Sequence, residues 1–179
     1  MDPHISVASI DDIPGLMSLV NSAYRGKEAK KGWTHEADLI DGSLRTDEVS
    51  LINMIKVPNA VILKYQDKDK ILGCVYLEKK GEKLYLGMLS VLPDIQGGGI
   101  GKKLLKAAEE HAGKNNCILI EMRVISVRKI LIDWYERQGY RKTKKTEPFH
   151  NNKKFGVPRE PIEFIVLEKE LPSIVNRQS

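Results

Sequence analysis

The stretch Gln96-Gly97-Gly98-Gly99-Ile100-Gly101 decides how this chain is expected to fold, because of the segments on either side of it. Residues 83–92 before it read as an apolar strand, and residues 102–115 after it carry leucine and alanine at helical spacing. Glycine permits a positive φ and lets a ligand approach the backbone without meeting a Cβ. The unpaired N–H groups of a first helical turn bind anions, aided by the helix dipole. The sequence therefore predicts a phosphate site at this turn.

Two common phosphate motifs do not fit the stretch. A P-loop has a hydroxyl residue after its lysine, but Lys102 is followed by Lys103, so the usual magnesium ligand is missing. The dinucleotide-binding spacing Gly-x-Gly-x-x-Gly begins at Gly97 and Gly99 but meets Lys102 where its third glycine belongs. Judged on the glycines alone, a flexible turn without a ligand remains the alternative.

A longer pattern surrounds the glycines. Val91-x-Pro93-x-x-Gln96-x-x-Gly99-x-Gly101, followed by a basic amphipathic helix, resembles the acyl-CoA pyrophosphate loop of the GNAT superfamily of acetyl-CoA-dependent N-acetyltransferases. The resemblance implies a mixed α/β fold, α+β-like. The central sheet implied by the resemblance is of the GNAT type, mixed and largely antiparallel, with about seven strands flanked by helices.

A second segment supports the resemblance independently. Residues 131–140 read Leu-Ile-Asp-Trp-Tyr-Glu-Arg-Gln-Gly-Tyr, a helix end that meets a glycine and then an aromatic strand. This is similar to the GNAT segment in which an aromatic-Tyr-Glu helix end runs into Gly-Phe or Gly-Tyr. Core packing is the alternative explanation for Trp134 and Tyr135 taken alone.

The rest of the chain reads as alternating helices and strands, which implies an α/β domain with a mixed sheet. The 179 residues suit one domain rather than two. We expect a single acyl-CoA N-acyltransferase domain over residues 1–179, with a core at about 5–170 and a flexible tail at 172–179. Helices are expected from residue 13 and at 35–40 and 47–55, and strands at 5–10, 60–65, 71–77, 83–92, 118–124, 140–145 and 163–169.

Composition restricts the function classes. The net charge of +5 suits a phosphate-bearing cofactor, but the basic residues are spread and aromatic residues make up 6%, so no nucleic-acid motif is visible. No apolar run approaches the ~20 residues of a membrane span, and no secretory signal begins the sequence. Cys74 and Cys117 lie in apolar segments and read as buried free thiols. We expect a cytoplasmic protein with no metal, no membrane partner and no nucleic-acid partner.

The resemblance implies that backbone groups hold acetyl-CoA. Leu89 matches the family position whose amide faces the thioester carbonyl, and Val91 matches the contact to the pantetheine arm. Many members have Asn where Arg128 stands, so that contact to the arm is altered here or moved to Ser126. The implied cofactor-binding residues are Leu89, Ser90, Val91, Gln96, Gly97, Gly98, Gly99, Ile100, Gly101, Lys102, Ser126 and Arg128.

Two residues are the catalytic candidates. Tyr135 matches the tyrosine that in many members protonates the departing CoA thiolate. A phenol near pKa 10 gives its proton to a thiolate near 8.5 at a cost of roughly 2 kcal/mol, so hydrogen-bond stabilisation of the thiolate is an equal description. Glu121, in the strand at 118–124, is the candidate base for the amine. Its alternative is an ion pair with a cross-strand lysine.

The acceptor side is expected at two polar segments, residues 32–38 and 147–161. Trp33, His35, Glu36 and Phe149 are the candidate substrate residues, and the second segment reads as a loop without regular structure, of the kind that forms lids. His35 and Glu36 are also alternatives for the base.

The function expected from these residues is transfer of an acetyl group from acetyl-CoA to a primary amine of a small molecule, by direct attack in a ternary complex. A catalytically inactive acyl-CoA-binding or sensor module, a protein N-terminal or lysine acetyltransferase, and a basic nucleic-acid-binding domain remain the alternatives. Homodimer formation is left open.

Overall fold

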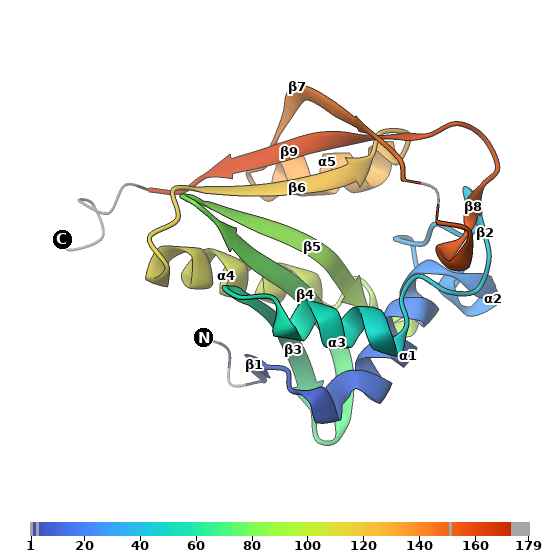
Figure 1. The fold of residues 1–179 in the computed structure, drawn as a ribbon, viewed down its shortest axis with the longest axis horizontal. Coiled ribbons are helices and arrows are strands. Elements are labelled where there is room, and N and C mark those ends of the chain that lie inside the picture. The colour runs from blue at the N-terminus through green and yellow to red at the C-terminus, as the bar shows by residue number, and fades with distance from the viewer. Residues whose placement is uncertain (1, 3, 151, 173–179) are drawn as a thin grey trace.

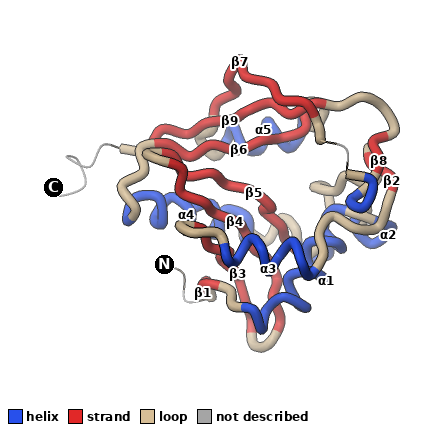
Figure 2. The backbone as a smooth tube through the Cα atoms, viewed as in Figure 1, coloured by secondary structure: helices blue, strands red, loops and turns tan. Residues whose placement is uncertain are grey.

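A seven-stranded sheet forms the framework of the computed structural model, which describes residues 2, 4–150 and 152–172 (Figures 1 and 2). Neighbouring strands run antiparallel except β5 and β6, which are parallel. The sheet therefore confirms the predicted mixed, largely antiparallel architecture. In the order β1-β3-β4-β5-β6-β9-β7 the strands are β1 (Ile5–Val7), β3 (Ala60–Asp67), β4 (Lys70–Lys80), β5 (Lys83–Val91), β6 (Leu119–Ile125), β9 (Glu163–Glu170) and β7 (Arg141–Pro148).

Helices cover both faces of the sheet, and each face has its own apolar core. One core lies between the sheet and α4 and α5, and the other between the sheet and α1 and α3 (Figure 1). Leu104 of α4 and Leu16 of α1 are fully buried, one in each core. The helices are α1 (Ile13–Tyr24), α2 (Gly26–Ala29), α3 (Glu48–Lys56), α4 (Ile100–Lys114) and α5 (Lys129–Arg137).

The sheet opens between its two parallel strands. β5 and β6 pair only from Lys83 with Leu119 to Leu86 with Met122, and beyond these residues they separate (Figure 1). β5 stays paired with β4 as far as Val91, and β6 stays paired with β9 as far as Ile125. The two halves of the sheet thus diverge like the arms of a V, and backbone groups along the inner edges of both arms lack a strand partner.

A β-bulge in β5 lies just inside this opening. Cys74 pairs with Ser90 but Tyr76 pairs with Gly87, so two residues of β5 lie opposite one of β4, and Met88 has φ 54°. A bulge changes the face toward which the following side chains point. Before the bulge Leu86 faces α4, and after it Leu89 also packs on that side. Strict alternation would have placed Leu89 on the opposite face.

Two expectations about the connecting segments are wrong. Residues 35–40 form no helix, since 37–39 are a turn and Ile40 begins a strand, and the segment at 147–161 is not irregular throughout. The two segments meet as a second, two-stranded sheet of β2 (Ile40–Asp41) and β8 (Val157–Pro158). Gly42 and Gly156 permit this contact, because a Cβ on Gly42 would lie 3.2 Å from the Gly156 Cα. The segment predicted to be a lid is therefore fixed to the body.

Smaller corrections concern the N-terminal strand and the tail. β1 ends at Val7, because Ser9 turns the chain into a short 3₁₀ helix (Ile10–Asp12) and its N–H donates to the Asp12 carboxylate at 2.8 Å. Within the expected flexible tail only Pro172 lies inside the described residues. No helix in the described part of the chain is long and apolar enough to cross a membrane.

Both cysteines are buried free thiols, as predicted. The Cys74 thiol lies 3.9 Å from the Met88 carbonyl, and its burial raises its pKa to about 12. A thiol held protonated in this way is unreactive at neutral pH.

The core on the α4 side yields a stability prediction. Leu104→Ala should lower the free energy of unfolding by about 2–5 kcal/mol, because it leaves a cavity at a fully buried position. Urea unfolding followed by circular dichroism measures the difference. Lys106→Ala, at an exposed position on the same helix, is the control and should stay within about 0.5 kcal/mol of the parent. Equal effects of the two changes would contradict the assignment of this core.

Candidate active site

Two cavities meet at the opening between β5 and β6. The first, about 410 Å³, is bounded by the glycine loop and α5, and we call it the loop cavity. The second, about 420 Å³, is lined by β5, β6 and the segments that precede and follow them, and we call it the strand cavity. Both volumes are in the usual range for small-ligand sites. The residues common to both linings are Tyr24, Leu89, Arg128, Leu131 and Tyr135.

The glycine loop places free N–H groups on the loop cavity. Gly99 is the N-cap of α4 with φ 86°, a left-handed conformation that favours glycine. The first helical hydrogen bond runs from the Lys103 N–H to the Gly99 carbonyl at 3.1 Å, so the three N–H groups before it have no partner within the helix. The loop residues on the cavity are Gly97, Gly99, Ile100, Gly101 and Lys102, while Gly98 and Ser90 are outside the lining.

Electrostatics at the start of α4 also favour an anion. The first turn contains Lys102 and Lys103 and no acidic residue. Each positive charge beside the positive end of the helix dipole lowers the stability of the protein by about 0.3–1 kcal/mol. Lys103 is paired with Asp2 at 3.2 Å, whereas Lys102 lines the cavity. A bound phosphate would compensate both the Lys102 charge and the helix dipole.

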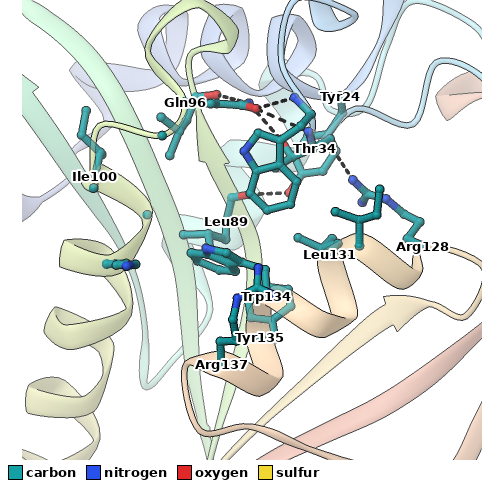
Figure 3. Close-up of a pocket in the computed structure, with 17 residues that line it drawn as sticks. Tyr24, Thr34, Leu89, Gln96, Ile100, Arg128, Leu131, Trp134, Tyr135 and Arg137 are labelled. Atoms are coloured by element: carbon teal, nitrogen blue, oxygen red, sulfur yellow. Dashed lines mark hydrogen bonds between the residues drawn. The ribbon is translucent and has the colours of Figure 1, made fainter.

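Gln96 fastens the glycine loop to the segment after α2. Its side-chain oxygen accepts from the N–H groups of Trp33 at 2.9 Å and Thr34 at 3.4 Å. Its side-chain nitrogen donates to the Thr34 hydroxyl at 2.9 Å and to the Val91 carbonyl at 3.0 Å (Figure 3). The amide has thus used its two donors and both lone pairs within the protein. Gln96 lines the cavity, but it acts as a clamp.

Leu89 lies at the junction of the two cavities. The Tyr24 hydroxyl, at the end of α1, donates to the Leu89 carbonyl at 2.5 Å (Figure 3). Burial raises the pKa of Tyr24, with Glu36 adding to the effect, so this hydroxyl stays a donor at neutral pH. The expected roles of Leu89 and Val91 rest on backbone groups, and both residues line the loop cavity as those roles require. Ser90 is buried, and its hydroxyl donates to the Met88 carbonyl at 3.0 Å.

Tyr135 projects from α5 toward Leu89 (Figure 3). It is 6% exposed and packs edge-on against Trp134 and Tyr140, with ring centroids 5.0 and 5.8 Å away. Its hydroxyl makes no hydrogen bond within the described residues. Burial, followed by the nearby Tyr24, raises the pKa of Tyr135 far above its ordinary value of 10. The structure therefore presents a neutral phenol at the cavity junction.

A buried charge network lies beside this junction. The Glu36 carboxylate is held on one oxygen by Arg25 and lies 3.4 Å from an Arg128 guanidinium nitrogen on the other. Arg128 also donates to the Thr34 carbonyl, and Arg25 donates to the Phe155 carbonyl at 3.1 Å. Arg128 therefore lines both cavities as part of a protein network, while its expected substitute Ser126 lines neither cavity.

The four expected acceptor residues are not all brought together. Glu36 lines the strand cavity, but Trp33 lines the loop cavity, where its ring lies edge-on to Trp134 at 6.0 Å. His35 lines neither cavity and lies 4.0 Å from Asp38. Phe149 packs on Phe164, a residue of the strand-cavity wall, with ring centroids 5.2 Å apart.

Glu121 lies outside both cavity linings. Its carboxylate is 3.1 Å from the Lys83 ammonium and 3.4 Å from the Arg123 guanidinium. This is the cross-strand ion pair that the sequence left open as the alternative. The structure does not bring Glu121 to the junction with Tyr135.

Several lining residues were not predicted from the sequence. Tyr24 ends α1 without any motif around it, and Thr34, inside the expected acceptor segment at 32–38, lines the loop cavity instead and is bonded to Gln96. The face of α5 was detectable in principle, since its cavity residues recur at helical spacing. These α5 residues are Ile130, Leu131, Trp134 and Arg137. Among the described residues, no group of histidine, cysteine and acidic side chains is arranged to hold a metal ion.

Comparison with known proteins agrees with this geometry. A family model described as "Acetyltransferase (GNAT) domain" matches residues 58–142, which include β5, the glycine loop, α5 and Tyr135. The thialysine N-epsilon-acetyltransferase of Sus scrofa is 30% identical over 77 residues. That match covers 43% of this chain and 45% of the relative, so the chain aligns with less than half of that protein's length.

Solved structures share the fold over nearly the whole chain. The ribosomal-protein-S18-alanine N-acetyltransferase from Escherichia coli superposes with a TM-score of 0.69 at 14% identity, covering 95% of this chain and 94% of that chain. The structure of yncA from Salmonella typhimurium with its cofactor acetyl-CoA superposes with a TM-score of 0.67 at 14% identity, covering 94% of each chain. At these identities the likeness concerns the fold.

The glycine loop is tested by adding a charge to it. Gly101→Asp places a carboxylate in the loop cavity, since a Cβ there lies 3.4 Å from the Trp134 ring. Like-charge repulsion should weaken acetyl-CoA binding by on the order of 100-fold or more, as measured by calorimetry. Gly81→Asp is the control, because it adds the same charge in the turn between β4 and β5, outside both cavity linings and with nothing within 4 Å of the added Cβ; its positive φ strains that turn alone. Unchanged affinity in folded Gly101→Asp would mean that the anion site lies elsewhere.

Proposed function

We propose that this chain, in which residues 58–142 match the "Acetyltransferase (GNAT) domain" model, transfers an acetyl group from acetyl-CoA to a primary amine of a small molecule, by direct attack in a ternary complex. The single observation that supports this best is the meeting of two cavities at Leu89 and Tyr135. Acetyl-CoA enters from the loop cavity and the amine from the strand cavity. The thioester then lies where both linings coincide.

In this proposal the cofactor is held mainly by backbone groups. The pyrophosphate binds the free N–H groups at the start of α4, with Lys102 beside them. The pantetheine arm runs between the open edge of β5 and the apolar face of α5, where Leu131 and Trp134 cover it. The apolar walls exclude water from the thioester.

The bulge and Tyr135 supply the two polar contacts that the reaction needs. The carbonyl oxygen gains negative charge as the amine attacks, and the Leu89 N–H is the proposed donor to it. Tyr135 is the proposed partner of the departing sulfur. Because its pKa is raised, full proton transfer to a thiolate costs more than it would from an ordinary phenol. We therefore assign Tyr135 a hydrogen bond to the developing thiolate.

Deprotonation of the amine is assigned to the environment of the strand cavity. An amine with pKa near 10.4 costs about 4–5 kcal/mol to deprotonate at pH 7. The cavity carboxylates of Glu36 and Glu147 are both held by arginines, so neither is a free base. Desolvation and the surrounding cations lower the pKa of a bound amine, and water carries the proton away.

A first experiment separates this function from its alternatives. Calorimetric titration with acetyl-CoA is followed by a thiol-release assay over small amines and over peptides with free N-termini or lysines. Binding with turnover of small amines supports the proposal. Binding without turnover of any amine identifies an acyl-CoA sensor, and turnover of peptides alone identifies a protein acetyltransferase.

The Tyr135 hydroxyl is tested by a single-atom change. Tyr135→Phe should lower kcat by roughly 100-fold, the low end for a lost acid–base or hydrogen-bonding group, while the Kd of acetyl-CoA stays within about twofold. Tyr140→Phe is the matched control, because it removes a buried hydroxyl that lines neither cavity. If kcat of Tyr135→Phe stays within twofold of the parent, the residue serves packing alone.

The raised pKa of Tyr135 also predicts the shape of the pH profile. A group whose pKa lies above 10 keeps its proton throughout the range from pH 6 to 10, so it remains a donor. The rate should rise with pH as the amine deprotonates, and no fall due to Tyr135 should follow below pH 10. A descending limb in this range that disappears in Tyr135→Phe would refute the assignment.

A further inference from the structure

Most charged residues of the strand cavity have a partner of opposite charge. Arg123 forms two hydrogen bonds with the Glu147 carboxylate, at 2.5 and 2.9 Å. Lys80 lies 3.3 Å from Glu78 and over the Tyr85 ring. These contacts neutralise the outer part of the cavity.

The inner part keeps a net positive charge. Glu36 lies between Arg25 and Arg128, so one carboxylate faces two guanidinium groups. Both cavity carboxylates, Glu36 and Glu147, are thus occupied by arginines. A second cationic group on the acceptor would find no free acidic partner here, and it would be repelled by the excess charge.

Arg45 also lines the strand cavity, and it differs from the other cations there. Among the described residues, no carboxylate lies within ion-pairing distance of its guanidinium, which instead stacks over the Tyr24 ring at 5.6 Å from the centroid. The same Tyr24 donates to the Leu89 carbonyl at the cavity junction. One tyrosine therefore separates the unpaired cation from the place where the thioester is expected.

The backbone at Arg45 is firmly held. The Asn21 side-chain oxygen accepts from the N–H groups of Arg45 at 2.7 Å and Thr46 at 3.0 Å, and the Asn21 nitrogen donates to the Thr46 carbonyl at 3.1 Å. These three bonds from α1 do not involve the guanidinium. The side chain is thus positioned by the fold while its donors remain available to a ligand.

We propose that the acceptor is a small primary amine that also carries an anionic group, a carboxylate or a phosphate, and that Arg45 binds that group. This deepens the proposed function and rests on it for the assignment of the amine to the strand cavity. Arg128 is less suited to the role, because its guanidinium already binds Glu36 and Thr34. The same argument disfavours polyamines, whose remaining charges are all positive.

The test uses binding to the protein saturated with CoA, which holds the cofactor site but transfers nothing. Calorimetry compares common amino acids with their decarboxylated amines, and phosphoethanolamine with ethanolamine. In at least one pair the anionic member should bind about tenfold or more tightly, the effect of a hydrogen bond to a charged group. Whether the carboxylate or the phosphate pairs show this preference distinguishes the two anions.

Variants assign the preference to Arg45. Arg45→Gln should remove most of the preference without changing the affinity of the amine that lacks the anionic group or the affinity of CoA, and Arg45→Lys should retain part of the preference. Arg141→Gln, at an exposed arginine on β7, is the matched control and should change nothing. If Arg45 had only a structural role, its replacement would change the affinity of both members of a pair and leave the preference between them intact.

The outcomes separate the inference from the proposed function. Equal binding within every pair, binding of no pair, or a preference that survives in Arg45→Gln overturns the inference. Thiol release measured on the same pairs decides the function independently. A preference lost in Arg45→Gln but without turnover supports an anion site at Arg45 and refutes the acetyltransferase. Turnover of the amines that lack an anionic group, as efficient as turnover of their partners that carry one, supports the acetyltransferase and refutes the role of Arg45.

Discussion

The separation of β5 from β6 is the constraint on which the rest of the site depends. Past Leu86 and Met122 the two parallel strands stop exchanging hydrogen bonds, and each arm is held from its outer side by β4 or β9. Exposed backbone groups at an inner strand edge are costly unless they find another partner. In the proposed function the cofactor takes that place, and the strands on either side of the opening line the two cavities.

Sequence alone predicted the parts of the site that depend on local chemistry. The glycine loop is readable because the left-handed φ at Gly97 and Gly99 favours glycine. The position of Tyr135 was readable because a helix end followed by Gly139 has a local signature. In both cases the residues that identify the feature lie within a few positions of it in the sequence.

The parts that were missed depend on contacts between distant segments. Glu36 and Arg128 are 92 residues apart, and nothing near either residue specifies the other. Side chains of a regular strand alternate between its two faces, but the bulge at Met88 shifts this alternation by one residue. The face toward which Leu89 points could therefore not be predicted from the sequence. The sequence suggested Glu121 as the base, but its position depends on a distant strand. Pairing of β6 with β5 places Glu121 opposite Tyr85 and beside the Lys83 ammonium, outside both cavity linings.

The four hydrogen bonds of Gln96 have a thermodynamic consequence. They tie the segment that begins at Trp33 to the glycine loop, and that segment continues through Thr34 to the Glu36 and Arg128 pair in the other cavity. One short piece of backbone therefore contributes to the linings of both cavities. A ligand that orders this piece from one side reduces the conformational entropy that the other ligand must still remove. In the proposed ternary complex, linkage makes this gain in affinity the same whichever of the two ligands binds first.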